Sequence, residues 1–100
     1  MKDNLNFLEE LFSTIEKRAK SKDSKSYTKQ ILKNGKNKIA QKVMEESSEL
    51  IIDYLNGSKK RAIEEASDLI YHLFVLLYSK KINLNDIKKE LKKRQNVRHR

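Results

Sequence analysis

The sequence contains no cysteine, no proline and only two glycines among its 100 residues. The lack of cysteine excludes disulfide bonds and thiolate chemistry. Proline and glycine are the residues that most often interrupt helices, and 37% of the residues are charged. This composition favours a single domain over residues 1–100, built from long helices that are joined by short connections.

Long apolar runs are also missing. The most apolar stretch covers residues 69–78, which is well below the roughly 18 residues needed for a membrane span. The first residues, MKDNLNFLEELF, lack an uninterrupted apolar stretch followed by a small-residue cleavage site. We therefore expect no membrane association and no export signal, and we place the protein in the cytoplasm.

Apolar periodicity predicts an all-α fold of about five helices. Gly35 and Gly57 mark two helix ends, Ser58 is a candidate N-cap, and Asn83 with Asp86 forms a candidate capping box. The predicted helices cover residues 6–19, 27–33 and 36–55, then one that follows Ser58 and one that follows Asn83.

The apolar faces of the predicted helices indicate how they pack. Beyond Asp68 the fourth helix is apolar nearly all round, so several of its sides need cover. In so small a chain this cover is most simply supplied by a second subunit, and we predict an antiparallel helix bundle completed by homodimerisation. The residues expected on the inner faces are Ile39, Val43, Leu50 and Tyr54 of the third helix, and Ile63, Ala66, Leu69, Ile70, Leu73 and Leu77 of the fourth.

Two acidic clusters lie on either side of the turn at Gly57. The first reads Glu45-Glu46-x-x-Glu49 and the second Glu64-Glu65-x-x-Asp68. Residues three apart share a helix face, so Glu46 projects with Glu49, and Glu65 with Asp68. If the two helices fold back on each other, these four carboxylates converge. Carboxylates that close repel one another unless a cation lies among them, and Mg²⁺ prefers such oxygen ligands.

Spacing alone leaves other interpretations open. Acidic clusters often decorate solvent-facing surfaces, although the absence of any basic residue in residues 43–57 argues against a simple surface helix. Lys42 is a charge partner for a phosphate or for a nearby glutamate. His72 either orients Asp68 or contacts a phosphate, or it is a core or interface residue. The hydroxyls of Ser26 and Thr28 either bind phosphate or cap a helix.

The formal charge of +9 indicates a polyanionic partner. Residues 42–68 carry four basic and seven acidic residues, a net charge of −3, which leaves +12 for the rest of the chain. A basic surface around an acidic metal site suits a magnesium-bound triphosphate. The alternative, a basic nucleic-acid-binding module, fits the basic tail, but it leaves the acidic clusters unexplained. We expect residues 95–100 of that tail to be frayed.

The run SYTKQILKNGKNKIAQKVMEESSEL, followed by IEEASDLIYHLFVLL, resembles the phosphoribosyl-ATP pyrophosphohydrolases of histidine biosynthesis. These belong to the all-α, MazG-like nucleoside triphosphate pyrophosphohydrolases. The wider group is marked by Glu-Glu-x-x-Glu followed by Glu-x-x-Asp, and the narrower family adds three further motifs. The matching positions are Glu45, Glu46, Glu49, Glu65 and Asp68 for the wider group, and Ser26 to Thr28, Lys42 to Glu46 and Asp68 to His72 for the family.

The resemblance implies Mg²⁺-dependent hydrolysis of phosphoribosyl-ATP to phosphoribosyl-AMP and pyrophosphate. It implies that the metal is held by Glu46, Glu49, Glu65 and Asp68. It also implies that Glu45 orients one of these ligands or a water molecule and is not itself a metal ligand. The implied substrate-binding residues are Lys42, Ser26, Tyr27, Thr28 and His72, with weaker candidates at Lys59, Lys60 and Arg61.

Two departures and one competing activity accompany this resemblance. Met44 and Ser47 stand where the family pattern has smaller residues. Some relatives are fused to a cyclohydrolase, which nothing in this chain resembles, so a separate cyclohydrolase is expected to perform the next step. A house-cleaning enzyme would use the same metal site on a different (d)NTP, and a substrate panel separates the two activities.

Overall fold

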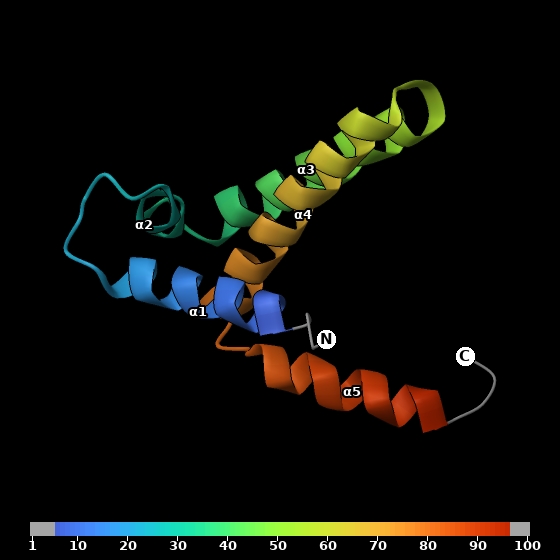
Figure 1. Ribbon diagram of the computed structural model, residues 1–100. Helices are drawn as coiled ribbons and strands as arrows, with labels where there is room; N and C mark the ends of the chain where they lie inside the picture. The colour runs from blue at the N-terminus through green and yellow to red at the C-terminus, as the bar shows by residue number, and fades with distance from the viewer. Residues whose placement is uncertain (1–5, 97–100) are drawn as a thin grey trace.

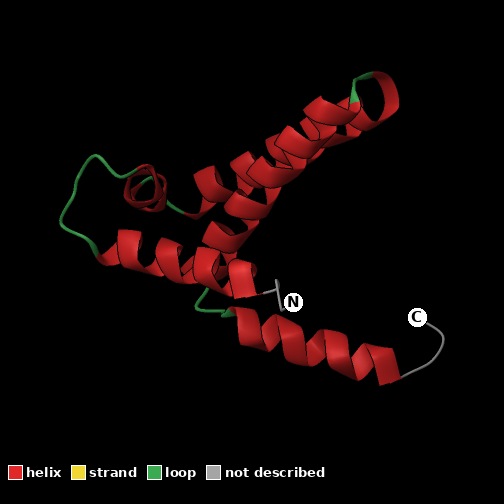
Figure 2. Cartoon of the chain, in the orientation of Figure 1, coloured by secondary structure: helices red, strands yellow, loops and turns green. Residues whose placement is uncertain are grey.

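The computed structural model describes residues 6–96, and every secondary-structure element in that range is a helix (Figures 1 and 2). This confirms the prediction of an all-α fold with five helices. The helices are α1 (Asn6–Lys20), α2 (Tyr27–Lys33), α3 (Lys36–Asn56), α4 (Lys59–Ser79) and α5 (Leu84–Asn96). None of the described helices is both long enough and apolar enough to cross a lipid bilayer.

The dominant feature is the antiparallel hairpin of α3 and α4, whose interface is the most extensive in the chain (Figure 1). The turn at Gly57 joins the two helices, and its amide donates to the Asp53 carbonyl oxygen at 2.9 Å. The predicted cap at Ser58 is confirmed, because its hydroxyl oxygen accepts from the Arg61 amide at 3.1 Å. Glu49 and Glu65 lie eight positions before and after Gly57, and their carboxylates are close together across the hairpin.

The apolar core lies at the base of the hairpin, where α1 and α2 pack against the start of α3 and the end of α4. The Phe12 and Phe74 rings stand 5.3 Å apart with an interplanar angle of 57°, a geometry worth about 0.5–1.5 kcal/mol beyond burial. The buried apolar residues are Phe12, Ile15, Ile31, Ile39, Phe74 and Val75. The opposite, turn end of the hairpin extends away from α1 and α2 (Figure 1).

The predicted inner faces of the long helices are wrong in part. Tyr54 is 75% exposed, Ile63 is 58% exposed, and Ile70 and Leu73 are each 38% exposed. The face of α4 that turns towards the rest of the chain includes Glu65 and His72 instead. An apolar stripe shows that a helix face needs cover, but it does not show which neighbour supplies that cover.

The predicted helix boundaries at α2, α3 and α5 are confirmed. Gly35, at the start of α3, has φ +96°, a left-handed conformation that glycine adopts without a steric penalty. Asn83 and Asp86 form the predicted capping box, with amide-to-side-chain distances of 3.0 and 2.9 Å. Of the tail predicted to fray, residues 95–96 are the end of α5, and residues 97–100 lie outside the described residues.

The turn gives a test of the hairpin. A methyl group at Gly57 would lie 3.0 Å from the Asp53 Cα and 2.5 Å from its Oδ1. Gly57→Ala should therefore lower the free energy of unfolding by about 1–3 kcal/mol, because the turn must shift away from Asp53 in the last turn of α3. Urea denaturation measures this change. The neighbouring exposed residue provides the control, and Asn56→Ala should stay within about 0.5 kcal/mol of the wild type. Equal stability of the two variants would contradict this description of the turn.

Candidate metal centre

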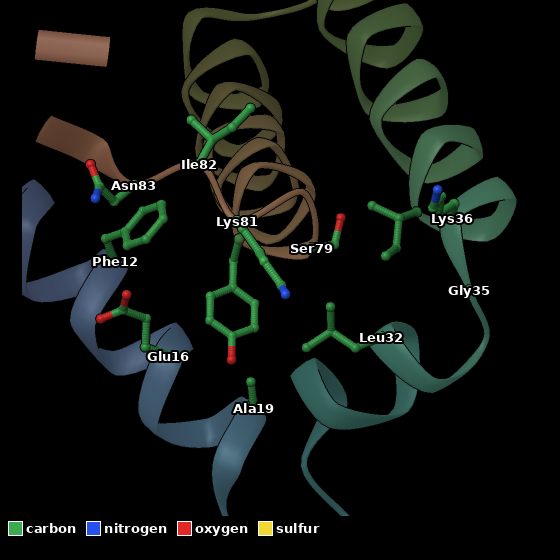
Figure 3. A pocket seen from close by; sticks show the side chains of 12 residues that line it. Phe12, Glu16, Ala19, Leu32, Gly35, Lys36, Ser79, Lys81, Ile82 and Asn83 are labelled. Atoms are coloured by element: carbon green, nitrogen blue, oxygen red, sulfur yellow. The ribbon is translucent and has the colours of Figure 1, made fainter. Parts of the chain in front are cut away.

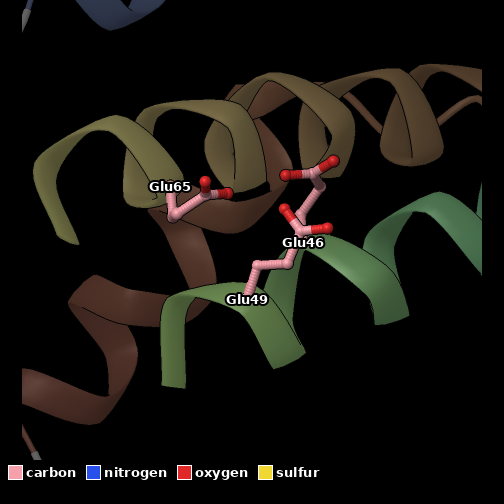
Figure 4. A group of neighbouring side chains, drawn as sticks. All are labelled: Glu46, Glu49 and Glu65. Carbon is pink, nitrogen blue, oxygen red and sulfur yellow. The ribbon is translucent and has the colours of Figure 1, made fainter. Parts of the chain in front are cut away.

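Three carboxylates meet between the helices of the hairpin. Glu46 and Glu49 come from α3 and Glu65 from α4, and one oxygen of each lies within 4.8 Å of the others. Figure 4 shows the three side chains directed towards one another across the helix interface. The spacing of the first cluster and the placement of Glu49 and Glu65 on either side of the turn explain this convergence. The structure therefore brings together three of the four metal ligands expected from the sequence.

The fourth expected ligand, Asp68, does not join the group of three among the described residues. It is exposed, on α4, one turn beyond Glu65. The main-chain oxygen of Asp68 accepts a hydrogen bond from His72 Nδ1 at 2.8 Å. The idea that His72 orients the Asp68 carboxylate is therefore wrong, because the contact is with the main chain.

Two of the clustered carboxylates are buried and incompletely satisfied. Glu46 is 6% exposed and Glu65 is 5% exposed. The Oε1 atom of each is buried and has no hydrogen-bond partner among the described residues. Buried carboxylate oxygens without partners are energetically costly, and a hard divalent cation would satisfy them. The donor set of the site thus fits Mg²⁺.

Basic side chains flank the carboxylate cluster on both sides. Lys42 Nζ lies 3.6 Å from Glu45 Oε1 and also 3.6 Å from Glu46 Oε2, so it points towards the cluster. Arg61 Nη2 donates to Glu65 Oε2 at 2.9 Å. Each buried carboxylate therefore has one oxygen paired with a cation from its own helix, and its second oxygen turned to the shared interior.

The environment of Glu65 changes its proton affinity. Burial raises the pKa of the Glu65 carboxyl to about 7, and the nearby negative charge of Glu49 adds to this effect, while Arg61 opposes it. The pKa is raised because ionisation of the buried Glu65 places a second negative charge beside Glu49. A cation between the helices would replace the proton of this carboxyl.

A polar network connects α2 to α4 beside the carboxylates. Tyr27 Oη and His72 Nε2 are 2.8 Å apart. Because the Asp68 carbonyl can only accept, His72 Nδ1 carries the hydrogen, and Nε2 then accepts from the Tyr27 hydroxyl. Burial raises the pKa of Tyr27, although Lys42 opposes this effect, so the phenol remains a donor at neutral pH. His72 is thus a buried residue that positions Tyr27.

The remaining substrate-binding candidates have structural contacts. Ser26 caps α2 by accepting from the Lys29 amide at 3.3 Å. Thr28 is 1% exposed and hydrogen-bonds the Tyr71 hydroxyl, so it holds α2 against α4 and leaves almost no surface for a ligand. Tyr27 is 48% exposed, and it is the member of this trio with a large accessible surface.

Two cavities lie close to the core, and sequence reasoning found neither. One, of about 240 Å³, is lined by Tyr27, Lys38, Lys42 and Glu45 among others, and Lys42 connects it to the carboxylate cluster through Glu46. The sequence signal for this cavity is the spacing of Lys38 and Lys42, which are one helical turn apart and therefore share a face of α3. The other, of about 590 Å³, lies at the base of the hairpin between α1, the start of α3 and the end of α4 (Figure 3). No residue of the carboxylate cluster lines this second cavity.

Comparisons with known proteins cover nearly the whole chain. The family described as phosphoribosyl-ATP pyrophosphohydrolase matches residues 8–95. A phosphoribosyl-ATP pyrophosphatase of Sulfolobus acidocaldarius is 46% identical over 94 residues, which are 94% of this chain and 97% of the relative. One from Clostridium novyi is 41% identical over 93 residues, or 93% of this chain and 84% of the relative. The histidine biosynthesis bifunctional protein HisIE of Buchnera aphidicola is 46% identical over 94% of this chain but only 44% of its own length.

The raised pKa of Glu65 predicts opposite effects of pH with and without a metal. In the absence of a divalent cation, the folded chain keeps this proton up to about pH 7, whereas the unfolded chain loses it near 4.5. The folded state then binds more protons between these values, so Glu65 makes stability fall as the pH rises from about 4.5 to 7. Metal binding needs the ionised carboxylates, so the rise in Tm caused by Mg²⁺ should grow from pH 6 to pH 8.

Thermal unfolding followed by circular dichroism, with Mg²⁺ or with EDTA, measures both effects. The control is Glu65→Gln, which removes the titrating group and should lose most of the growth of the Mg²⁺ effect between pH 6 and 8. An Mg²⁺-induced shift in Tm that is the same at every pH, and the same in this variant, would contradict a cation at Glu65.

Proposed function

This chain belongs to the phosphoribosyl-ATP pyrophosphohydrolase family, and from this premise we propose that it is an Mg²⁺-dependent hydrolase. Its substrate is phosphoribosyl-ATP, and its products are phosphoribosyl-AMP and pyrophosphate, within histidine biosynthesis. The observation that carries the metal requirement is the meeting of three carboxylates, two of them with a buried oxygen that lacks a partner. The family and its named relatives favour this substrate over the dNTPs of a house-cleaning enzyme.

The proposed reaction breaks the anhydride between the α- and β-phosphates. Water adds its oxygen to phosphorus, the bridging P–O bond breaks, and pyrophosphate leaves. The bound Mg²⁺ would neutralise the triphosphate and acidify a water molecule. Glu46, Glu49 and Glu65 would hold the ion, and Asp68 would join them from the next turn of α4. A carboxylate of this group accepts the proton released by water.

The flanking cations have a proposed role with the phosphates. Lys42 and Arg61 each contact a buried glutamate, at 3.6 and 2.9 Å, so they stand at the border of the cluster where phosphate oxygens would approach. Negative charge that develops there is stabilised by fixed cations. Glu45 accepts a hydrogen bond from Gln41 at 2.8 Å and forms an ion pair with Lys42. These contacts suit a residue that orients the metal ligands without binding the metal itself.

We also propose that the active form is a homodimer. Large apolar residues are exposed on both α3 and α4, and those of α3 recur with helical spacing. These residues are Met44, Ile51 and Leu55 on α3, and Ile63, Ile70 and Leu73 on α4, each between 38% and 71% exposed. We call this set the outer apolar face. A second hairpin packed against it would complete a four-helix arrangement and remove this surface from water.

The proposed place in metabolism is the cytoplasm, at the step before a cyclohydrolase acts. Bifunctional histidine biosynthesis proteins match this chain over 43–46% of their own length. Residues 8–95 correspond to the pyrophosphohydrolase family. We therefore expect the ring-opening step that follows to be performed by a cyclohydrolase outside these 100 residues.

The function is tested with purified protein, Mg²⁺ and phosphoribosyl-ATP, by measuring pyrophosphate release. Glu49→Gln keeps the shape of a metal ligand but removes its charge, so the rate should fall by about 100-fold or more while the circular dichroism spectrum is unchanged. Glu90→Gln is the matched control, since Glu90 is an exposed residue of α5 paired only with Arg94 among the described residues. Full turnover by Glu49→Gln would refute the metal site, and faster turnover of a dNTP than of phosphoribosyl-ATP would refute the substrate.

The dimer is tested by light scattering after size-exclusion chromatography. The wild type should have twice the 11.8 kDa mass of one chain, and Ile70→Glu should have the mass of one chain because it places a charge on the outer apolar face. Ile51→Glu repeats the test from α3. Leu91→Glu, on α5 and 57% exposed, is the control and should remain dimeric. Dimers in both face variants would contradict the proposed interface.

A further inference from the structure

The cavity of about 240 Å³ next to the carboxylates lies between α2 and the first turns of α3. At its inner end are Lys42 and Glu45, and Lys42 pairs with the metal ligand Glu46. The lining also includes Gln30, Asn34 and Lys38, and Lys38 lies one helical turn further from Glu46 than Lys42 does. We call these three residues the outer end of the cavity. This volume is below the roughly 300–1,000 Å³ of sites that enclose a whole drug-sized ligand. The cavity is therefore suited to one part of a nucleotide whose other part reaches the metal.

The polar groups at the outer end have spare hydrogen-bonding capacity. Lys38 is exposed and forms no ion pair among the described residues, unlike Lys42 one turn later. The Asn34 side chain makes no hydrogen bond within the described part of the chain. The Gln30 amide donates to the Ser24 carbonyl at 3.2 Å, which leaves its own oxygen free to accept. A cation, an amide and an acceptor together suit a sugar phosphate.

The local charge also favours an anion. Residues 17–42 contain ten basic residues and one acidic residue, a net charge of +9 that equals that of the whole chain. Such a field attracts anionic ligands to the α2 side of the carboxylate cluster. The triphosphate must reach the carboxylates, so the outer end of this cavity is available to a second, separate anionic group.

Phosphoribosyl-ATP has such a group, and ATP lacks it. We propose that Lys38, assisted by Asn34 and Gln30, binds the 5′-phosphate and ribose of the phosphoribosyl group and so selects phosphoribosyl-ATP over ATP. This assignment rests on the proposed function. The Tyr27 ring lines the same cavity and is held by His72, so it forms a fixed wall between the phosphoribosyl end and α4.

The test uses steady-state release of pyrophosphate by three variants of the full chain in Mg²⁺. Lys38→Gln should raise KM for phosphoribosyl-ATP by about tenfold, the loss of one charge-assisted contact, with kcat within about twofold of the wild type. Lys38→Arg should restore most of the affinity. Lys33→Gln removes the same charge from the end of α2 outside this cavity, and it should behave like the wild type, which separates contact from long-range attraction.

Inhibition by phosphoribosyl-AMP and by AMP identifies the part of the ligand that Lys38 contacts. Lys38→Gln should weaken inhibition by phosphoribosyl-AMP about tenfold and leave inhibition by AMP unchanged. Equal weakening for both inhibitors would place the shared adenosine phosphate at Lys38 and overturn the assignment. Identical KM values for Lys38→Gln and Lys33→Gln, in a protein whose wild type releases pyrophosphate, would refute this assignment alone. A wild type without turnover would refute the proposed function itself.

Discussion

The structure depends on holding like charges together against their repulsion. Glu49 and Glu65 face each other across the hairpin, and Glu46 lies beside them. Glu46 and Glu65 are buried, where carboxylates are poorly solvated, while Glu49 is exposed. Packing between α3 and α4 and the core at the base of the hairpin fix the helices at this separation. Arg61 and Lys42 reduce the repulsion only in part, in keeping with the raised pKa of Glu65, and a divalent cation would remove the rest.

The inner and outer faces of the hairpin carry different kinds of residues. The inner face of α4 carries Glu65 and His72, which belong to the candidate site, while its outer face carries Ile63 and Ile70. The end of the hairpin near the turn has no cover from α1 or α2 (Figure 1). A second subunit on the outer apolar face would therefore stabilise the same helix pair that positions the carboxylates, so assembly and catalysis would depend on one element.

Much of this fold could be predicted from the sequence because its signals are local. The capping box at Asn83 and the cap at Ser58 act within a few residues, and the structure confirms both. The shared face of Glu46 and Glu49 follows from helical spacing. Asp68 has the same spacing from Glu65 that Glu49 has from Glu46, yet it is exposed and does not join the group, so spacing alone does not decide which carboxylates converge.

The rest depends on contacts between distant segments, for which a single sequence carries little signal. The bond between Tyr27 and His72 joins residues 45 positions apart, and it requires α2 to fold back after an irregular loop. Acidic residues usually face water, but Glu65 is buried. Apolar periodicity therefore assigned part of the inner face of α4 wrongly. The cavity at Lys38 arises from the same packing of α2 on α3.

Anomalous diffraction from crystals grown with Mn²⁺ in place of Mg²⁺ tests the central claim most directly, since it locates the ion without reference to activity. The account predicts an anomalous peak between α3 and α4, at coordination distance, about 2.0–2.3 Å, from carboxylate oxygens of Glu46, Glu49 and Glu65. Ordered crystals in which these three carboxylates contact only protein or water, with the metal bound elsewhere or nowhere, would contradict it.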